Sequence, residues 1–280
     1  MKILIFGGKG YFGQEFKKVY PDAVASDADI ADPAEIANIL EHEKPDTVIN
    51  CAGKTGRPNV DWCEDHKMET LRSNVVGPLV LLEECAKRNI YFVQMGTGCI
   101  YEGNNHGKGF SESDPPNFFG SFYSRSKGWL DHILREFPVL LLRLRMPFDD
   151  VPHDRNLITK LAKYPGVIDI ENSLTYVPDF MRAARFLVQK RAIGLYNIVN
   201  PGSFTGYKIM KLYKEIVDPS HTFEKIPLED LLKRVKAGRS NCTLSMEKLT
   251  REGITLMPIE QAVRKALHAY KEAYVSQYAP

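Results

Sequence analysis

The sequence lacks the features of a membrane protein, a nucleic-acid-binding protein or a disulfide-stabilised protein. No apolar run approaches the ~20 residues needed to cross a bilayer. The formal net charge is only +2, which gives no electrostatic footprint for nucleic acid or an anionic membrane. The five cysteines form no CxxC pair, and the histidines show no metal-like spacing. The chain opens directly with a predicted strand, which leaves no room for a signal peptide. We therefore expect a cytoplasmic protein with no metal site, no nucleic-acid partner and no membrane segment.

Apolar runs alternate with amphipathic stretches along the first half of the chain. Strands are predicted over residues 3–6, 23–25, 47–51, 90–95 and 139–144, with one further buried strand over 195–199. Helices are predicted from a capping box that begins at Asp32, and over residues 68–88, 121–136 and 259–274. Alternation of this kind predicts βαβ units and a parallel sheet.

The pattern changes after about Met146, where prolines interrupt the chain and mostly short helices are expected. We therefore predict an α/β protein with a doubly wound Rossmann domain and a smaller C-terminal substrate lobe. Residues 1–148 would form the Rossmann domain, with 178–200 returning to it, and residues 149–177 and 201–280 would form the lobe. Ligands are expected at the carboxyl ends of the strands, in the cleft between the two.

A glycine-rich turn follows the first predicted strand. Gly7, Gly10 and Gly13 give the pattern G-x-x-G-x-x-G and open the first helix. Such a turn needs a positive φ, and the pyrophosphate of a dinucleotide must approach the backbone N–H groups at the start of a helix. We therefore predict a dinucleotide site that includes Gly7, Lys9, Gly10, Tyr11, Phe12 and Gly13.

Two signals conflict over the choice between NADPH and NADH. Asp27 lies at the end of the second predicted strand, where an acidic residue would hold the adenosine ribose and favour NADH. Lys9 lies inside the glycine turn, where it would meet the 2′-phosphate of NADPH, and Asp29 would instead face the adenine. NADPH is the predicted cofactor, with NADH as the alternative.

Tyr123 and Lys127 are four residues apart and therefore share one face of a predicted helix. Free tyrosine has a pKa near ~10, about three units too high for proton donation at neutral pH. A neighbouring ammonium would stabilise the phenolate and so lower the pKa of the tyrosine. Lowering that pKa by three units requires about 4 kcal/mol. Thr97, at the end of the fourth predicted strand, would add a second hydroxyl. We predict that these three residues are catalytic and that Lys127 also binds the cofactor. The alternatives are a surface Tyr/Lys pair and a turn-forming Thr.

Longer segments carry a family resemblance that covers nearly the whole chain. They are residues 55–64 (TGRPNVDWCE), 96–100 (GTGCI), 116–124 (PNFFGSFYS), 143–147 (RLRMP), 156–160 (NLITK) and 239–241 (RSN). Together with the glycine turn, residues 50–53 and the Tyr/Lys pair, they resemble the nucleotide-sugar reductases of the extended short-chain dehydrogenase superfamily. The resemblance is greatest to the 3,5-epimerase/4-reductases that make UDP-rhamnose.

This resemblance implies a UDP-4-keto-6-deoxyglucose substrate, which is epimerised at C3 and C5 and then reduced at C4 to UDP-L-rhamnose. By position, Cys99 and Lys160 would form the acid/base pair of the epimerisation, with the two roles not assigned between them. Ala52 and Gly53 would contact the cofactor. The implied substrate-binding residues are Arg57, Asn74, Asn156 and Arg239. Asn74 falls inside a predicted helix, where Asn is unfavourable, so a structural role is the alternative for it. The 3,5-epimerase/4-reductases that this chain resembles are plant enzymes, and they have a basic residue where this chain is acidic, around residues 26–29. This difference bears on the choice between NADPH and NADH.

One ketone-binding site can serve both reactions. A C4 ketone acidifies the protons on C3 and C5, and hydroxyls aimed at its oxygen would stabilise the enolate and later protonate the alkoxide. Three alternatives remain: a 4-dehydrorhamnose reductase without epimerase activity, a GDP-fucose-type epimerase-reductase, and a non-catalytic NADP-binding regulatory subunit. Cys99 and Lys160 argue against the first, residues 57–64 against the second, and the intact Tyr/Lys pair against the third. A homodimer is compatible with the sequence.

Overall fold

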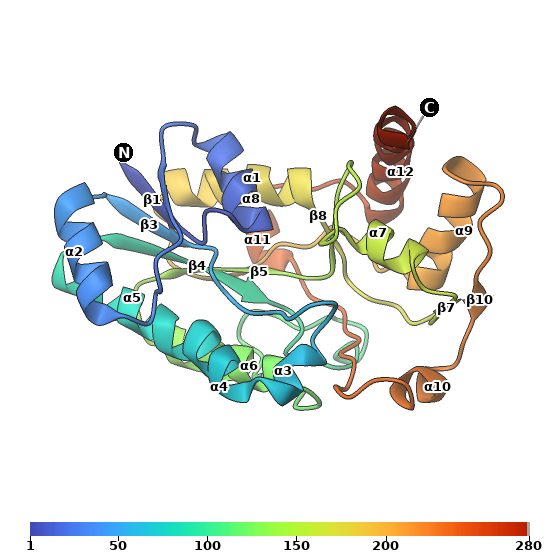
Figure 1. The fold of residues 1–280 in the computed structure, drawn as a ribbon, viewed down its shortest axis with the longest axis horizontal. Helices are drawn as coiled ribbons and strands as arrows, with labels where there is room; N and C mark the ends of the chain where they lie inside the picture. The colour runs from blue at the N-terminus through green and yellow to red at the C-terminus, as the bar shows by residue number, and fades with distance from the viewer. Residues whose placement is uncertain (279–280) are drawn as a thin grey trace.

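The computed structural model describes residues 1–278 and is built on a six-stranded parallel sheet (Figure 1). Its strand order is β2-β1-β3-β4-β5-β9, and every neighbouring pair is parallel. The strands are β1 (Ile3–Phe6), β2 (Val24–Ser26), β3 (Thr47–Asn50), β4 (Tyr91–Thr97), β5 (Leu140–Leu144) and β9 (Gly194–Asn197). All six correspond to predicted strands, with bounds that differ by one or two residues.

Helices cover both faces of this sheet. On one face, α1 (Tyr11–Val19), α8 (Val177–Gln189) and α11 (Glu247–Arg251) pack against strand residues such as Ile3 and Ile5. On the other, α2 (Pro33–Glu43), α5 (Gly77–Lys87) and α6 (Phe122–Leu134) pack against the alternate residues Leu4 and Phe6. Because successive strand side chains point to opposite faces, an apolar run such as β1 serves both layers. The predicted doubly wound α/β fold is confirmed.

The helix predicted over residues 68–88 is interrupted. It comprises α4 (Lys67–Leu71), a π turn η1 (Arg72–Val76) and α5, and the short α3 (Trp62–Asp65) precedes it. A π turn places one extra residue in a helical turn and is frequent at functional sites. Here it contains Asn74, which the sequence analysis singled out as an unfavourable residue within a helix.

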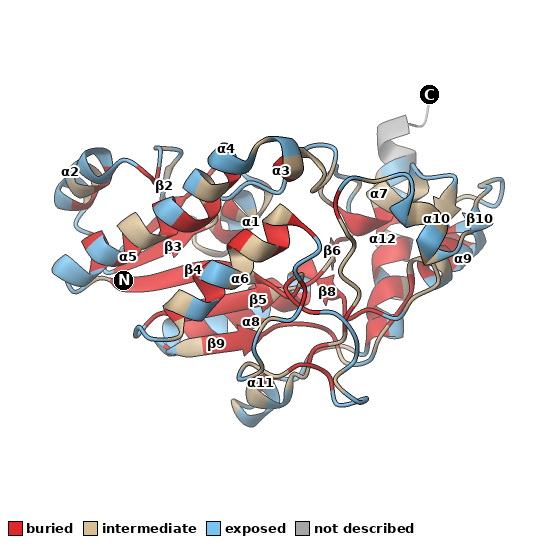
Figure 2. Cartoon of the chain, turned by 90° about the horizontal axis from the view of Figure 1, so that it is seen from below, coloured by how far each residue is buried: buried red, intermediate tan, exposed pale blue. Residues whose placement is uncertain are grey.

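A second hydrophobic cluster lies beyond the end of the sheet, at the right of Figure 1. It is formed mainly by α7 (Leu157–Ala162), α9 (Gly206–Ile216) and α12 (Ile259–Tyr278), together with the two-stranded sheet of β6 (Pro147–Phe148) and β8 (Thr175–Tyr176). Beside it lie β7 (Gly166–Val167), β10 (Glu224–Lys225) and α10 (Leu228–Leu232). Figure 2 shows buried residues concentrated in the sheet and in α12, whereas α10 has no buried residue.

The prediction of mostly short helices after Met146 is wrong. Helix α8 has 13 residues and α9 has 11. Pro178 occupies the first turn of α8, and the Thr205 hydroxyl caps α9 by accepting from the Lys208 amide at 3.0 Å. These are ordinary helix starts, and buried apolar residues recur along both helices at helical spacing, so the sequence contained the signal for them. No helix among the described residues is long and apolar enough to cross a membrane.

A buried ion pair joins α6 to the sheet. The Arg143 side chain, on β5, is 0% exposed, and its Nε and Nη2 each donate to the Asp131 carboxylate of α6 at 2.7 Å. Arg135 donates to the same carboxylate at 3.1 Å. A bidentate guanidinium–carboxylate contact fixes orientation as well as distance. It therefore holds the helix that carries Tyr123 and Lys127 in one position on the sheet.

We expect Asp131→Asn to destabilise the protein strongly, because it leaves the Arg143 charge buried without its counter-ion. Removing one partner of a buried pair costs about 3–5 kcal/mol, measurable as a lower free energy of unfolding in urea. Asp230→Asn removes an exposed partner of Lys233 and should leave that free energy unchanged. Equal effects of the two substitutions would show that the buried pair does not anchor α6.

Candidate active site

The glycine turn lies where the strand order changes direction, between β1 and β3. Gly7 has a φ of +74°, and a Cβ there would lie 2.6 Å from the Ala52 backbone N. A Cβ on Gly13 would lie 2.2 Å from the Gly7 carbonyl oxygen. Gly10 is the N-cap of α1 and offers no side chain to the amides of the first turn. A close-packed turn with uncapped helix amides fits the pyrophosphate of a dinucleotide.

The two residues with conflicting cofactor signals bind each other. The Lys9 ammonium lies 3.4 Å from one oxygen of Asp27, and its backbone N–H donates to the other oxygen at 2.9 Å. Asp29 forms a separate pair with Arg72, whose Nη2 donates to it at 2.9 Å. A backbone hydrogen bond from Ala31, followed by that from Arg72, lowers the pKa of Asp29. Arg72, which the sequence analysis missed, thus adds a cation beside the end of β2.

The loop after β3 contains Ala52 and Gly53 and is held by Asn74. The Lys54 amide donates to the Asn74 side-chain oxygen at 2.8 Å, and the Asn74 side-chain nitrogen donates to the Lys54 carbonyl at 2.9 Å. The ideal Cβ position on Gly53 lies 3.2 Å from the same Asn74 oxygen. This buried side chain clamps the loop beside the glycine turn, which gives a structural reason for Asn within the helix.

The rings of Tyr11 and Phe12 contact residues outside the glycine turn. The Tyr11 hydroxyl donates to Asp149, and its ring stacks on His153 with centroids 4.8 Å apart. The ring of Phe12 packs edge-on against Phe180 of α8. The backbone of these residues, at the start of α1, is therefore the part that can face a dinucleotide.

Three predicted catalytic residues converge at the carboxyl end of β4. The Thr97 hydroxyl lies beside that of Tyr123 and acts to lower the pKa of the tyrosine, and the Cys99 amide donates to the Thr97 hydroxyl at 3.1 Å. Lys127, one turn after Tyr123 on α6, donates from its ammonium to the Met95 carbonyl at 3.0 Å. The start of α6 is capped by Ser121, whose hydroxyl accepts from the Ser124 amide.

The pKa of Tyr123 is raised in this structure, contrary to the prediction that Lys127 lowers it. Burial is the largest cause and Cys99 adds to it, whereas the Thr97 hydrogen bond and the Arg145 guanidinium act in the lowering direction. Burial also lowers the pKa of Lys127 to about 8, although Asp131 opposes this shift. The lysine is directed at a backbone carbonyl, so Arg145 is the cation that favours a phenolate at Tyr123.

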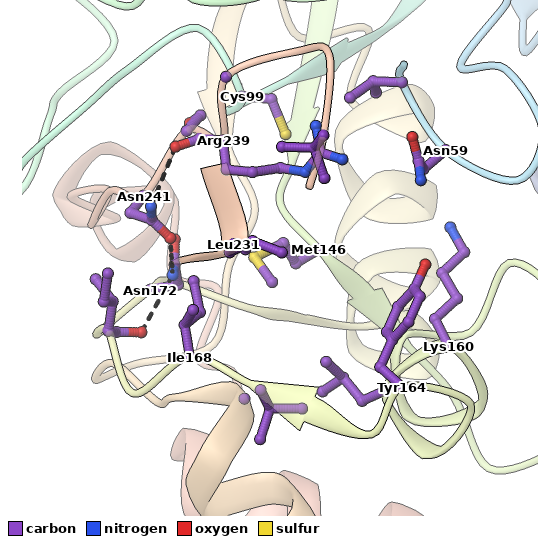
Figure 3. Close-up of a pocket in the computed structure, with 18 of the residues that line it drawn as sticks. Asn59, Cys99, Met146, Lys160, Tyr164, Ile168, Asn172, Leu231, Arg239 and Asn241 are labelled. Carbon is purple, nitrogen blue, oxygen red and sulfur yellow. Dashed lines mark hydrogen bonds between the residues drawn. The ribbon is translucent and has the colours of Figure 1, made fainter. Parts of the chain in front are cut away.

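A cavity of about 580 Å³ brings several predicted residues together. Cys99, Tyr123, Lys160 and Arg239 all line it, although they come from segments far apart in the sequence. Figure 3 shows Cys99 and Lys160 on different sides of this cavity. A ring placed between them would have a thiol on one side and an amine on the other.

Lys160 is partly withdrawn from solvent on helix α7. Burial lowers the pKa of Lys160, and the neighbouring charge of Arg155 adds to the effect, while Cys99 and Asp154 oppose it. Asn156 caps this helix: its side-chain oxygen accepts from the Ile158 amide at 3.0 Å, and its nitrogen donates to the carbonyl of Asp149 at 2.8 Å. The Asn156 amide is thus engaged with the chain and positions Lys160.

Arg57 and Arg239 lie at two different edges of the site. Arg239 donates to Asp61 at 2.9 Å and also lines the main cavity. Arg57 precedes a cis peptide bond to Pro58 and lines an adjoining cavity of about 510 Å³, to which Arg155 and Lys160 also contribute. The adjoining cavity is rich in cations, and the sequence analysis missed the contribution of Arg155.

Arg145 is the third functional candidate that the sequence analysis missed. Its side chain is buried and lines the main cavity, and its Nη1 donates to the Cys99 sulfur at 3.0 Å. Its Nη2 donates to the Ser240 carbonyl at 2.6 Å and to Asn172. In the sequence it is one of two arginines near the end of a strand, and nothing local indicates that it lies against a cysteine.

Known proteins match this chain along nearly its whole length. A bifunctional dTDP-4-dehydrorhamnose 3,5-epimerase/dTDP-4-dehydrorhamnose reductase from Arabidopsis thaliana is 40% identical over 84% of this chain and 81% of its own length. The crystal structure of the L780 UDP-rhamnose synthase from Acanthamoeba polyphaga mimivirus has a TM-score of 0.92 at 33% identity, over 96% of this chain and 99% of that one.

A more distant structure shows the fold alone. The dTDP-4-dehydrorhamnose reductase from Bacillus anthracis, solved in complex with NADP, has a TM-score of 0.80 at 17% identity, and the match covers 99% of both chains. These matches confirm the predicted superfamily and the prediction that the chain is an enzyme. The model of the RmlD substrate binding domain matches residues 1–272, and the chain therefore belongs to this family.

Proposed function

We propose that the protein epimerises UDP-4-keto-6-deoxyglucose at C3 and C5 and reduces it at C4 with NADPH to give UDP-L-rhamnose. The observation that carries the proposal is a single cavity lined by Tyr123, Cys99 and Lys160, with Thr97 beside the tyrosine. A reductase alone needs only the two hydroxyls. A thiol and an amine on different sides of the same cavity support an added proton-exchange reaction.

The names of the similar proteins support the same reaction type. The Arabidopsis relative is named for both 3,5-epimerisation and reduction of a dTDP-linked sugar, and the mimivirus protein is a UDP-rhamnose synthase. The mimivirus match covers almost the full length of both chains, so we propose the UDP-linked substrate. The Bacillus anthracis structure contains NADP, in agreement with NADPH as the proposed cofactor.

Reduction would take place at the carboxyl end of β4. A bound reduced nicotinamide supplies the hydride. The hydroxyls of Thr97 and Tyr123 hold the C4 oxygen of the sugar, and Tyr123 gives its proton to that oxygen as the alkoxide forms. Lys127, whose pKa of about 8 leaves it mostly protonated at neutral pH, would turn from the Met95 carbonyl toward the cofactor ribose.

Epimerisation would use the same hydrogen bonds to the C4 oxygen. Withdrawal of a proton from C3 or C5 places negative charge on that oxygen, which Thr97 and Tyr123 stabilise by hydrogen bonds. Cys99 and Lys160 then exchange protons with the carbon from opposite faces of the ring. Burial lowers the pKa of Lys160, which brings the amine closer to the range in which proton exchange at neutral pH is efficient.

The second hydrophobic cluster would be the core of the substrate lobe predicted for residues 149–177 and 201–280, although α11 of that range packs on the sheet. It supplies Lys160 on α7 and the segment that carries Arg239. We propose that Arg239 and Arg57 bind the diphosphate of the substrate, since a planar guanidinium matches phosphate oxygens in pairs. Arg239 donates to Asp61, so substrate binding would exchange one anionic partner for another.

Tyr123→Phe should abolish reduction while leaving cofactor affinity nearly unchanged. The substitution removes the hydroxyl that protonates the C4 oxygen, and general acids contribute about 10²–10⁴-fold in rate. Single-turnover oxidation of NADPH measures the loss, and fluorescence titration with NADPH shows whether the cofactor site survives. Near-normal turnover would exclude Tyr123 as the proton donor.

Substitutions of Lys9 and Asp27 should shift cofactor preference in opposite directions. Lys9→Ala removes the cation that would meet the 2′-phosphate, and a charge-assisted contact of about 1.5–3 kcal/mol corresponds to roughly tenfold or more in relative affinity. Asp27→Asn releases Lys9 and removes a repelling carboxylate, so preference for NADPH should rise. The ratio of the NADPH and NADH dissociation constants is the measurement. Parallel loss of both cofactors in the two variants would mean that this ion pair does not select between them.

Cys99→Ser and Lys160→Met should each block proton exchange at C3 and C5. A thiol with a reference pKa near ~8.5 can exchange protons near neutrality, whereas a serine hydroxyl cannot. Each variant is incubated with UDP-4-keto-6-deoxyglucose in D₂O, and deuterium at C3 and C5 is followed by NMR. Both variants should still reduce UDP-4-keto-L-rhamnose, in which both centres already have the product configuration. Incorporation of deuterium at the rate of the unsubstituted enzyme in both variants would exclude Cys99 and Lys160 as the groups that exchange these protons.

A further inference from the structure

Two arginines near the carboxyl end of β5 are buried in different surroundings. Arg143 is neutralised by the Asp131 carboxylate. Arg145, two residues later and 1% exposed, has no carboxylate partner among the residues that the structure describes. Its Nε also has no hydrogen-bond partner there. A buried guanidinium without a counter-ion is expensive, because removal of a cation from water costs several kcal/mol unless an anion compensates for it.

Three groups among the described residues contact the Arg145 side chain directly. Only one of them lines the cavity and can become an anion. Two of its contacts are neutral oxygens, of Ser240 and Asn172. The third is the Cys99 sulfur, 3.0 Å from Nη1. Burial acts to lower the pKa of Arg145, but Cys242 and Cys99 outweigh it and raise that pKa. The guanidinium is thus held in its charged form beside a thiol that faces the cavity.

We propose that Arg145 is the counter-ion of Cys99 and holds its sulfur as a thiolate in the resting site, so that Cys99 is the base of the epimerisation. The inference rests on the proposed function for the role of Cys99 in turnover, but the thiolate itself can be tested without substrate. A cation at 3 Å is the usual device by which proteins make a cysteine reactive at neutral pH.

The proton transfer then has a defined direction. The Cys99 thiolate takes a proton from C3 or C5: an S–H bond forms, the C–H bond breaks, and its electron pair becomes the C=C bond of an enolate with the charge on the C4 oxygen. The Lys160 ammonium returns a proton to the same carbon from the opposite face, and the ketone is restored. No electrons are gained or lost, and the thiol and the amine regain their starting forms by proton exchange with solvent.

Four ionisable groups face Cys99, each from a different segment. They are Arg145 after β5, Tyr123 on α6, Lys160 on α7 and Cys242. Arg145 is the one that contacts the sulfur directly. Cys242 directs its thiol to the Gly98 carbonyl at 3.3 Å. The charge of Arg145 should therefore dominate the protonation of Cys99.

The test is the pH dependence of Cys99 alkylation by iodoacetamide, followed by mass spectrometry of the Cys99 peptide in the full-length protein without substrate. In the unsubstituted protein the rate should rise with pH to a half-maximal midpoint that lies below the midpoint of Arg145→Met. Arg145→Met should move this midpoint upward and slow alkylation at pH 7 about tenfold or more. Arg145→Lys keeps a cation and should restore most of the shift, which a purely structural role would not predict.

Arg234→Met is the matched control, because Arg234 is an exposed cation that lines the same cavity. Its removal changes net charge equally and should leave the Cys99 midpoint unchanged. Identical midpoints in the unsubstituted protein and Arg145→Met would overturn the proposal, and so would an equal shift in Arg234→Met.

A second measurement covers the case in which Arg145→Met does not fold. The ultraviolet absorbance of a thiolate is compared between the unsubstituted protein and Cys99→Ser across the same pH range. A difference that persists at pH 7 supports the resting thiolate, whereas a difference that appears only above the ~8.5 of a free thiol contradicts it. Failure of sugar turnover with a persistent thiolate would refute the proposed function and leave the counter-ion assignment intact.

Discussion

The position of helix α6 is the constraint on which the site depends. The Arg143–Asp131 pair and the Lys127 contact with the Met95 carbonyl fasten this helix to β5 and β4. From the opposite side, the Glu64 carboxylate accepts from the Phe122 amide at the start of the helix. Tyr123 therefore meets Thr97 at the end of β4 because three separate contacts define where its helix begins and how it is rotated.

The site concentrates cations in a place with little solvent. Lys127, Arg145 and Lys160 are each withdrawn from water to a different degree, and burial opposes the charged form of each of them. Such an arrangement is costly for folding but suits an anionic substrate that forms an enolate. The structure offsets part of the cost with backbone carbonyls and the side-chain oxygen of Asn172, and in our account the Cys99 thiolate offsets more.

Local patterns in the sequence predicted much of the fold and part of the site. Strand periodicity and the glycine turn predicted the sheet and the start of α1, because both depend on residues close in sequence. The Tyr123/Lys127 spacing located α6 for the same reason. Helices α8 and α9 were missed although Pro178 and Thr205 mark their starts and their buried apolar residues recur at helical spacing.

Contacts between distant segments were beyond the reach of the sequence. The Lys9–Asp27 pair, the Asn74 clamp on Lys54 and the contact of Arg145 with Cys99 each join residues at least 18 positions apart. An isolated Arg or Asn gives no indication of whether it will be buried or what it will meet. The family resemblance named Cys99 and Lys160, but only the folded chain brings them to one cavity.

The central claim is that one cavity performs both epimerisation and reduction. Its most direct test is to incubate the purified protein with UDP-4-keto-6-deoxyglucose and NADPH and to identify the product by NMR. Our account predicts UDP-L-rhamnose, with inverted C3 and C5 and a reduced C4, and one NADPH oxidised for each sugar. A 6-deoxy sugar that keeps the D-configuration, or an unchanged substrate and cofactor, would contradict it.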